Sequence, residues 1–174
     1  MPISRHLLIS RKRAQRILTR LAYEVVERNR GSDSLILVGI RNRGVGLADT
    51  IASVIESFEG RRVPVHPLDV TAFRDDVAEQ LHVSPFESPP SVEGRHVLLI
   101  DDVLFTGRTV RAAIEAVLHF GRPASIQLAV LIDRGHREFP VQPDYTGLMV
   151  PTKHQERVVV DLTDGVQVFM EDQD

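Results

Sequence analysis

The stretch Val97–Thr109 constrains the fold more than any other part of the sequence. Its thirteen residues are Val-Leu-Leu-Ile-Asp-Asp-Val-Leu-Phe-Thr-Gly-Arg-Thr, so an apolar run leads into two adjacent carboxylates and then a small turn with hydroxyl groups. A continuous apolar run is typical of a parallel strand that is covered on both faces. From Val110 the apolar spacing becomes helical, and Gly121 and Pro123 end it. The stretch therefore predicts a buried strand, an acidic strand end, a loop and a helix.

The turn at residues 106–109 has the composition of a phosphate-binding loop. Its backbone N–H groups lie at a helix start, where the helix dipole and unpaired donors favour an anion. Asp101 and Asp102 suit ribose hydroxyls instead, or a divalent metal that is reached through those hydroxyls. Because successive strand residues point to opposite faces, the two acids can act alike only if the chain is already turning there. The alternative is a capped helix after a core strand, with acids that only solvate a loop.

Other segments complete the pattern of an α/β domain. Strands are predicted at 35–40 and 126–132, and helices at 17–26 and 47–55. Prolines 64 and 67 make residues 63–69 an edge strand or an irregular segment. Two valine-rich runs around Asp164-Gly165 predict a closing hairpin.

The composition favours one ordinary globular domain. The chain has 174 residues, of which 43% are hydrophobic and 26% are charged, and a formal net charge of −3. It contains no Cys, which excludes disulfides and thiolate metal sites. No apolar run is long enough for a membrane span or a signal-peptide core. We therefore expect a single domain, residues 1–174, in a cytoplasmic protein without membrane contact.

A second strand-to-helix turn, Gly39–Gly46, carries two arginines that suit an anion. Glycines there permit close approach of a ligand to the backbone, and Arg41 and Arg43 can each donate paired hydrogen bonds to phosphate oxygens. The spacing fits neither a Walker loop nor a dinucleotide fingerprint. Alone, the segment reads equally as a tight turn.

Taken together, these motifs resemble those of the type I phosphoribosyltransferases, and the similarity covers roughly residues 19–152. The resemblance implies a mostly parallel central sheet flanked by helices, with a small antiparallel hood. It implies that 5-phosphoribosyl 1-diphosphate (PRPP) and UMP bind the 97–109 motif. The residues that it assigns to this binding are Val97, Leu98, Leu99, Ile100, Asp101, Asp102, Val103, Leu104, Phe105, Thr106, Gly107, Arg108 and Thr109, with Arg41 and Arg43.

The closest resemblance is to a branch of that family that regulates pyrimidine operons and also converts uracil and PRPP to UMP and pyrophosphate. It implies that Asp101 and Asp102 hold ribose and Mg²⁺, while Arg43 and Arg74 neutralise pyrophosphate. Arg74 would lie in a flexible arm, about residues 70–95. A phosphoribosyltransferase for another base, without a regulatory role, is the alternative.

The resemblance also places a hood at about residues 133–152. Val130, Asp133 and Val150 are the expected neighbours of the base. RNA contacts are expected from Arg20 and Arg28 in the first helix and from Arg134, His136 and Arg137, in complex with the leader mRNA of a pyrimidine operon. For the basic helix the alternative is an ordinary solvated face. Family members are usually dimers or larger homo-oligomers.

Overall fold

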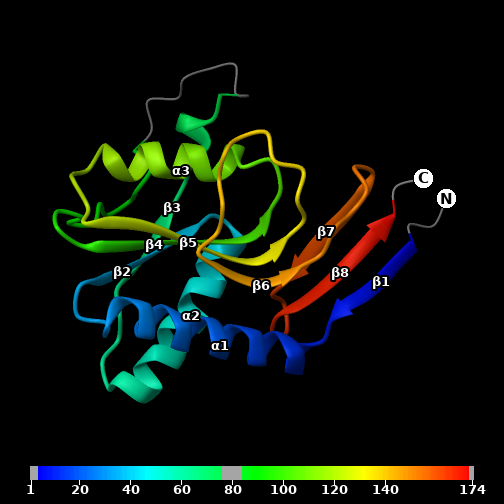
Figure 1. Cartoon of the computed structure of the whole chain (residues 1–174), viewed down its shortest axis with the longest axis horizontal. Coiled ribbons are helices and arrows are strands. Elements are labelled where there is room, and N and C mark those ends of the chain that lie inside the picture. Colours follow the sequence, from blue (N-terminus) through cyan, green and yellow to red (C-terminus); the bar gives the residue numbers. More distant parts are fainter. Residues whose placement is uncertain (1–3, 76–83, 173–174) are drawn as a thin grey trace.

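Five parallel strands form the central sheet in the order β3-β2-β4-β5-β6 (Figure 1). The computed structural model describes residues 4–75 and 84–172. The strands of this sheet are β2 (Leu35–Ile40), β3 (Val65–Leu68), β4 (His96–Leu104), β5 (Ser125–Asp133) and β6 (Tyr145–Met149). Every residue of β2 is buried, as expected for an inner parallel strand. The predicted type I phosphoribosyltransferase fold, with its mostly parallel sheet, is confirmed.

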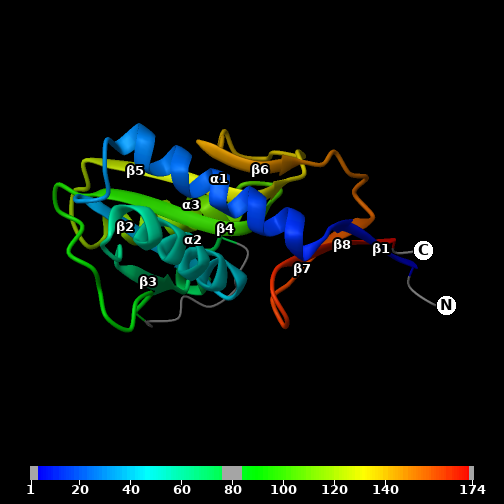
Figure 2. The same ribbon diagram turned by 90° about the horizontal axis from the view of Figure 1, so that it is seen from below.

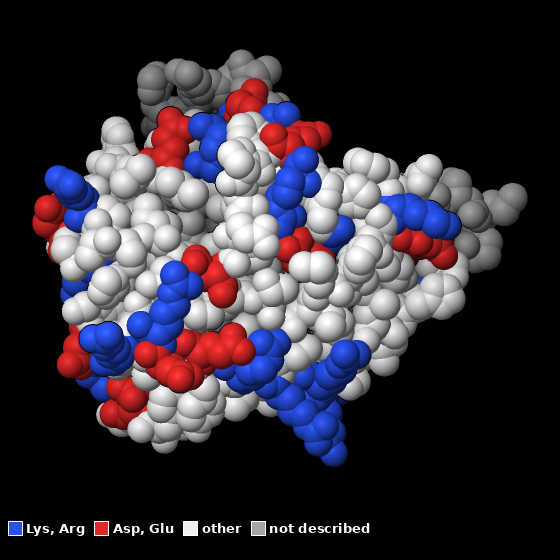
Figure 3. Space-filling model, in the orientation of Figure 1, with Lys and Arg blue, Asp and Glu red and all other residues white. Residues whose placement is uncertain are grey.

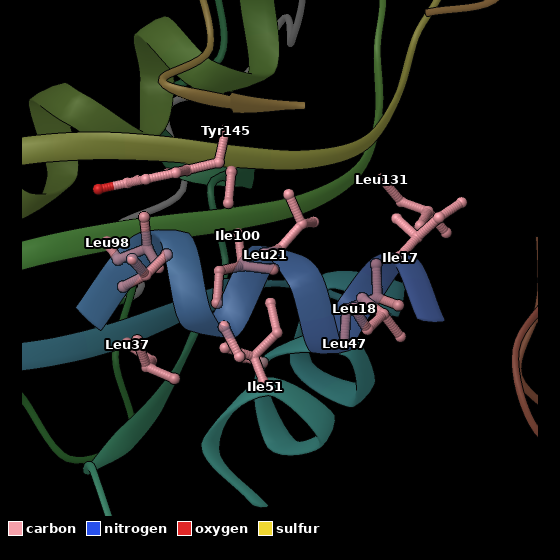
Figure 4. Close-up of a cluster of buried hydrophobic side chains, with 14 of the residues drawn as sticks. Ile17, Leu18, Leu21, Leu37, Leu47, Ile51, Leu98, Ile100, Leu131 and Tyr145 are labelled. Carbon is pink, nitrogen blue, oxygen red and sulfur yellow. The ribbon is translucent and has the colours of Figure 1, made fainter. Parts of the chain in front are cut away.

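Helices cover both faces of this sheet (Figure 2). The helices α1 (Arg11–Asn29) and α2 (Arg43–Glu59) pack on one face, and α3 (Arg108–Leu118) packs on the other. Alternate residues of β4 point to opposite faces of the sheet. Leu98 and Ile100 lie in the hydrophobic cluster under α1 and α2 (Figure 4), whereas Val97 and Leu99 lie in the cluster under α3. This alternation is the reason why the strands read as unbroken apolar runs.

A separate three-stranded antiparallel sheet, in the order β1-β8-β7, stands beside the carboxyl ends of the central strands. The predicted hairpin is its core, because β7 (Glu156–Asp161) pairs with β8 (Gln167–Asp172). Its third strand, β1 (Ser4–Ile9), was not predicted. Most of β1 is exposed, so its sequence carries no clear apolar alternation.

The expected arm at residues 70–95 lies only partly within the described chain. It begins with a short 3₁₀ turn, η1 (Thr71–Phe73), directly after the edge strand β3. From residue 84 onward the chain packs against the core, since Phe86 and Val92 are buried. The rings of Phe86 and Phe120 pack edge to face, with 5.2 Å between their centroids. The part between, residues 76–83, lies outside the described residues.

The start of α2 and the end of β4 approach each other closely. A Cβ atom on Gly44 would collide with the backbone carbonyl of Ile100 and would lie 3.4 Å from the Cα of Asp101. A Cβ on Gly46 would instead meet the flexible side chain of Leu162. Glycine at 44 therefore lets the second loop lie directly against the acidic end of β4.

This close approach predicts a difference between two glycine substitutions in one helix turn. Gly44→Ala should lower the free energy of unfolding by about 1–3 kcal/mol, because backbone atoms cannot yield as a side chain can. Gly46→Ala should cost clearly less, since Leu162 can adopt another rotamer. Denaturant unfolding of both variants checks this. Equal losses in the two variants would contradict a special role of the backbone contact with β4, because helix propensity by itself favours Ala over Gly at both positions.

Candidate active site

A polar pocket opens where β2, β3 and β4 end. Its volume is about 330 Å³. It collects residues from three loops that are far apart in the sequence: Arg41, Asn42, Arg43, Asp69, Val70, Thr71, Arg74, Asp101, Asp102, Val103 and Thr109. Open α/β sheets bind ligands at this edge, so the position agrees with the fold.

The predicted acids lie together in this pocket. Strand alternation ends at them, because Val103 packs in the same cluster as Ile100 although three positions separate the two residues. Asp101 is buried and accepts a hydrogen bond from the N–H of Asp102 at 2.9 Å. Asp102 is partly exposed and accepts one from the N–H of Val103 at 2.9 Å. β4 thus continues through both acids to Leu104, but its side chains change face there, so both carboxylates line one pocket without a turn of the chain.

Their environments give the two carboxylates different character. Burial, and secondarily the nearby charge of Asp102, raises the pKa of Asp101 well above its ordinary value. A nearby cation or hydroxyl donors would be needed to stabilise two ionised carboxylates at this place. The acidic pair is therefore suited to hold polar, electropositive groups of a ligand.

A second, smaller pocket of about 180 Å³ lies over the phosphate-loop sequence. It is lined by residues 103–110 together with Arg74 and Asp101. Gly107 occupies the N-cap of α3 with φ 90°, so no N-cap side chain accepts hydrogen bonds from the first helical turn. The N–H of Arg108 donates to the Thr106 hydroxyl at 3.3 Å, whereas no N-cap side chain covers the following N–H groups, so an anion could bind there; phosphate binding at this helix start stays a prediction.

Both arginines of the second loop line the larger pocket, and each is held by another segment. Arg43 starts α2, and its Nε donates to the carbonyl of Val160 in β7 at 2.7 Å. Arg41 forms an ion pair with Glu87 at 2.7 Å, and the peptide bond between Arg41 and Asn42 is cis. The second loop thus connects the pocket with the antiparallel sheet through Arg43.

Arg74 also reaches both pockets, from the end of η1. Sequence reasoning missed four other lining residues: Asn42, Asp69, Val70 and Thr71. Asp69 and Thr71 form a local pair, because Asp69 accepts hydrogen bonds from the N–H and the hydroxyl of Thr71. These bonds lower the pKa of Asp69. The sequence could have indicated Asp69 and Thr71, because polar residues that directly follow a predicted edge strand lie at the same edge of the sheet as the acids.

The residues expected at the base lie around the end of β5. Val130 is 1% exposed and belongs to the core cluster under α3. Asp133 is also buried, and its backbone carbonyl accepts from the N–H of Val150 at 2.8 Å. Burial acts to raise the pKa of Asp133, but hydrogen bonds from Arg137 and the Gly135 N–H outweigh it and lower the pKa. Base contact by these residues stays a prediction.

Two of the arginines expected at RNA have internal contacts. Arg137 donates to the Asp133 carboxylate at 2.7 Å and to the Phe105 carbonyl at 3.0 Å. Arg134 donates to Thr152 at 2.9 Å and lies over the Phe105 ring at 4.2 Å. Both guanidinium groups therefore hold the phosphate loop against the hood segment, and RNA contact by them stays a prediction.

The other three lie nearer the surface. Arg20 donates to the carbonyls of Thr146 and Gly147 and pairs with Glu24. Arg28 pairs with Asp144 at 2.8 Å, and this pair raises the pKa of Arg28. His136 faces His154, with 3.1 Å between their ring nitrogens. The two arginine contacts hold α1 against β6 and the residue before it, and RNA contact by all three residues stays a prediction.

Within the described residues, no group of three or more His, Asp or Glu side chains could hold a metal ion by itself. Mg²⁺ commonly binds proteins through one or two carboxylates and completes its shell with water and substrate oxygens. Asp101 and Asp102 fit that role in the pocket, with a phosphorylated ligand supplying the remaining oxygens.

Comparisons with known proteins agree with this geometry. Residues 8–161 match the family described as "Phosphoribosyl transferase domain". The "Bifunctional protein PyrR" of Pelotomaculum thermopropionicum is 55% identical over 151 residues, covering 85% of this chain and 83% of the relative. The protein of the same name from Chloroflexus aurantiacus is 52% identical over 164 residues, covering 91% of this chain and 90% of the relative. The chain belongs to the PyrR family.

Solved structures support the fold of this PyrR-family chain. The hypoxanthine phosphoribosyltransferase of Trypanosoma cruzi superimposes with a TM-score of 0.74 over 97% of each chain, at 17% identity. The enzyme of that name from Staphylococcus aureus gives a TM-score of 0.69 over 85% of this chain and 79% of that one, at 22% identity. No helix among the described residues is long and apolar enough to cross a membrane.

The buried acid of this site predicts a gain in stability on its removal. The folded-state pKa of Asp101 is raised, so its favourable contribution is present below the ordinary value of 3.8 and is lost as the pH rises through the raised value. Asp101→Asn is neutral throughout. The variant should therefore be more stable than the parent at neutral pH, with no such advantage near pH 3.8.

Thermal unfolding measured across this pH range checks the prediction. Asp164→Asn is the matched control, because that carboxylate is 79% exposed and pairs with Arg11 on the surface. A stability difference that does not change with pH would contradict a raised pKa at Asp101.

Proposed function

We propose that this PyrR-family chain transfers the phosphoribosyl group of PRPP to uracil, forming UMP and pyrophosphate. The observation that carries the proposal is the continuity of the two pockets, which share Arg74, Asp101, Val103 and Thr109. A helix start at one end and two arginines at the other suit a ligand with a phosphate and a pyrophosphate. The acids between them suit its ribose.

The proposed roles follow from this order along the site. Residues 106–109 hold the 5′-phosphate through backbone N–H groups and hydroxyls. Asp101 and Asp102 accept hydrogen bonds from the ribose hydroxyls and orient the sugar. Arg43 and Arg74 face the pyrophosphate, and Arg41 stands beside them. Bound Mg²⁺ supplies further neutralisation of pyrophosphate charge.

Positioning and charge stabilisation are the catalytic devices in this proposal, and no protein nucleophile is required. As the bond from C1′ to pyrophosphate breaks, positive charge develops on the ribose and negative charge on the departing group. The carboxylates lie on the side of the first charge and the guanidinium groups on the side of the second. The electron pair of the broken bond leaves with pyrophosphate, the base nitrogen forms the new bond to C1′, and the proton of that nitrogen is released with the pyrophosphate.

Uracil is proposed as the base because the relatives belong to the PyrR family. Its proposed neighbours are Asp133, at the end of β5, and Val150, directly after β6. The structural neighbours are named hypoxanthine phosphoribosyltransferases, so another base is the alternative. We further propose that the protein works in the cytoplasm as a homo-oligomer, as its resemblance to the family implies.

The enzyme proposal predicts UMP when the protein is mixed with PRPP, Mg²⁺ and uracil. Asp102→Asn should lower kcat/KM on the order of a hundredfold, because it removes a charge aimed at the reacting sugar. Asp49→Asn is the control, since Asp49 is an exposed acid on α2 that pairs with Arg62. Chromatography of the products measures UMP, with orotate, hypoxanthine and guanine in parallel. No nucleotide product from any base would reject the enzyme proposal.

We propose a second role, UMP-dependent binding of the leader mRNA of a pyrimidine operon to promote transcription attenuation. The carrying observation is the start of α1, where Lys and Arg side chains gather over the helix end next to β1 (Figure 3, lower right). Among the described residues, Lys12, Arg13 and Arg16 have exposed side chains and no acidic partner. Cations at the positive end of a helix dipole are unfavourable without an external anion.

A double variant that replaces two positively charged side chains by neutral ones tests this surface. Lys12→Gln with Arg16→Gln should weaken binding of leader RNA and reduce the salt dependence by roughly 1.4 units of log K per log unit of salt. UMP formation should stay at the parental rate. Arg61→Gln with Arg62→Gln is the control, because those cations already pair with acids at the far end of α2. Equal losses in both pairs, or binding that ignores UMP and RNA sequence, would count against a regulatory surface.

A further inference from the structure

The segment that carries Arg74 is held by the same helix that begins at the phosphate loop. Arg74 follows the short turn η1 and lines both pockets. Its two chain neighbours, Phe73 and Asp75, each accept a hydrogen bond from a side chain of α3. Nothing in the sequence around Arg74 predicts such a connection, because the partners lie more than thirty residues away.

The contact on the first side of Arg74 comes from Arg111. Its Nη2 donates to the Phe73 carbonyl at 2.7 Å, and its Nη1 pairs with Glu115 on the same helix at 2.8 Å. The Nε of Arg111 is buried without a hydrogen-bond partner among the described atoms. Arg111 thus lies partly desolvated against η1, an arrangement that fixes a backbone position more than it contributes to stability.

The contact on the second side comes from Arg108. Its Nη1 pairs with the Asp75 carboxylate at 2.6 Å, its Nε pairs with Glu138 at 2.8 Å, and the guanidinium lies 5.0 Å from the Phe139 ring centroid. Arg108 and Arg111 are three positions apart, so they share one face of α3. Together they hold the backbone before Arg74 and the side chain after it.

We propose that Arg108 and Arg111 are positioning residues that set Arg74 relative to the phosphate loop. The inference rests on the proposed function, because it takes PRPP as the ligand of the joined pockets. One rigid helix would then fix both the 5′-phosphate site at its N-terminus and the cation that faces the pyrophosphate. Holding a long side chain in place before binding reduces the entropy lost when the ligand arrives.

A purely structural role explains these contacts less well. The side chains of Arg108 and Asp75 are 36% and 42% exposed, and exposed ion pairs contribute little to folding stability. Their geometry is nonetheless specific, since Arg108 bonds two carboxylates from two different loops. Fixing the site is therefore the effect that such a pair can supply.

The test measures the affinity for PRPP with Mg²⁺ by calorimetry, for four proteins: the parent, Asp75→Asn, Arg74→Gln and the double variant. Asp75→Asn should weaken PRPP binding about three- to tenfold, a range comparable to the loss of one modest contact. Asp75→Glu, which keeps a carboxylate, should restore part of the loss. In the Arg74→Gln background, Asp75→Asn should have no further effect, because the side chain that it positions is gone.

The control is Glu24→Gln, which breaks a comparable arginine–carboxylate pair on α1, with Arg20, and touches neither Arg108 nor Arg111. It should bind PRPP as the parent does. Parental affinity in Asp75→Asn, an equal loss in both Arg74 backgrounds, or no PRPP binding by the parent would each overturn the positioning role. If the parent binds PRPP with the expected coupling but forms no UMP, the uracil activity fails while this inference stands.

Discussion

The close contact between the start of α2 and the end of β4 is the constraint on which the site depends. Gly44 lies against the backbone of Ile100 and Asp101, so the loop with Arg43 comes directly beside the acids. With a side chain at position 44, the pocket could not have its present form. The same loop reaches β7 through Arg43, which brings the antiparallel sheet to the edge where the parallel strands end.

The pocket brings side chains of opposite charge together from different loops. The pocket brings a buried carboxylate, whose pKa is raised chiefly by burial, together with arginines from two other loops. Each loop is held by contacts outside the pocket: Arg41 by Glu87, and the Arg74 segment by α3. A ligand that carries both hydroxyls and phosphates can therefore bind opposite charges without large rearrangement of the loops.

Much of the fold was predictable because its signals are local. The apolar runs of β2, β4 and β5, the helical spacing after the two loops, and the proline-bearing edge strand β3 each follow from periodicity within a few residues. By contrast, β1 and β6 were missed. The exposed β1 lacks an apolar pattern, and β6 was taken as part of a small antiparallel hood, whereas it pairs in parallel with β5. Strands at sheet edges depend on partners that periodicity does not reveal.

The sequence by itself determined which residues are candidates for the chemistry: the paired acids, the small hydroxyl-bearing loop, Arg41, Arg43 and Arg74 are all recognisable in it. Only the tertiary structure decided which of their functional groups meet in a pocket. It brought Asp101 and Asp102 to one cavity within a continuing strand, and it gave Arg134 and Arg137 internal partners. The reason is that periodicity fixes local backbone, whereas burial and ion pairing depend on segments that are distant in the chain.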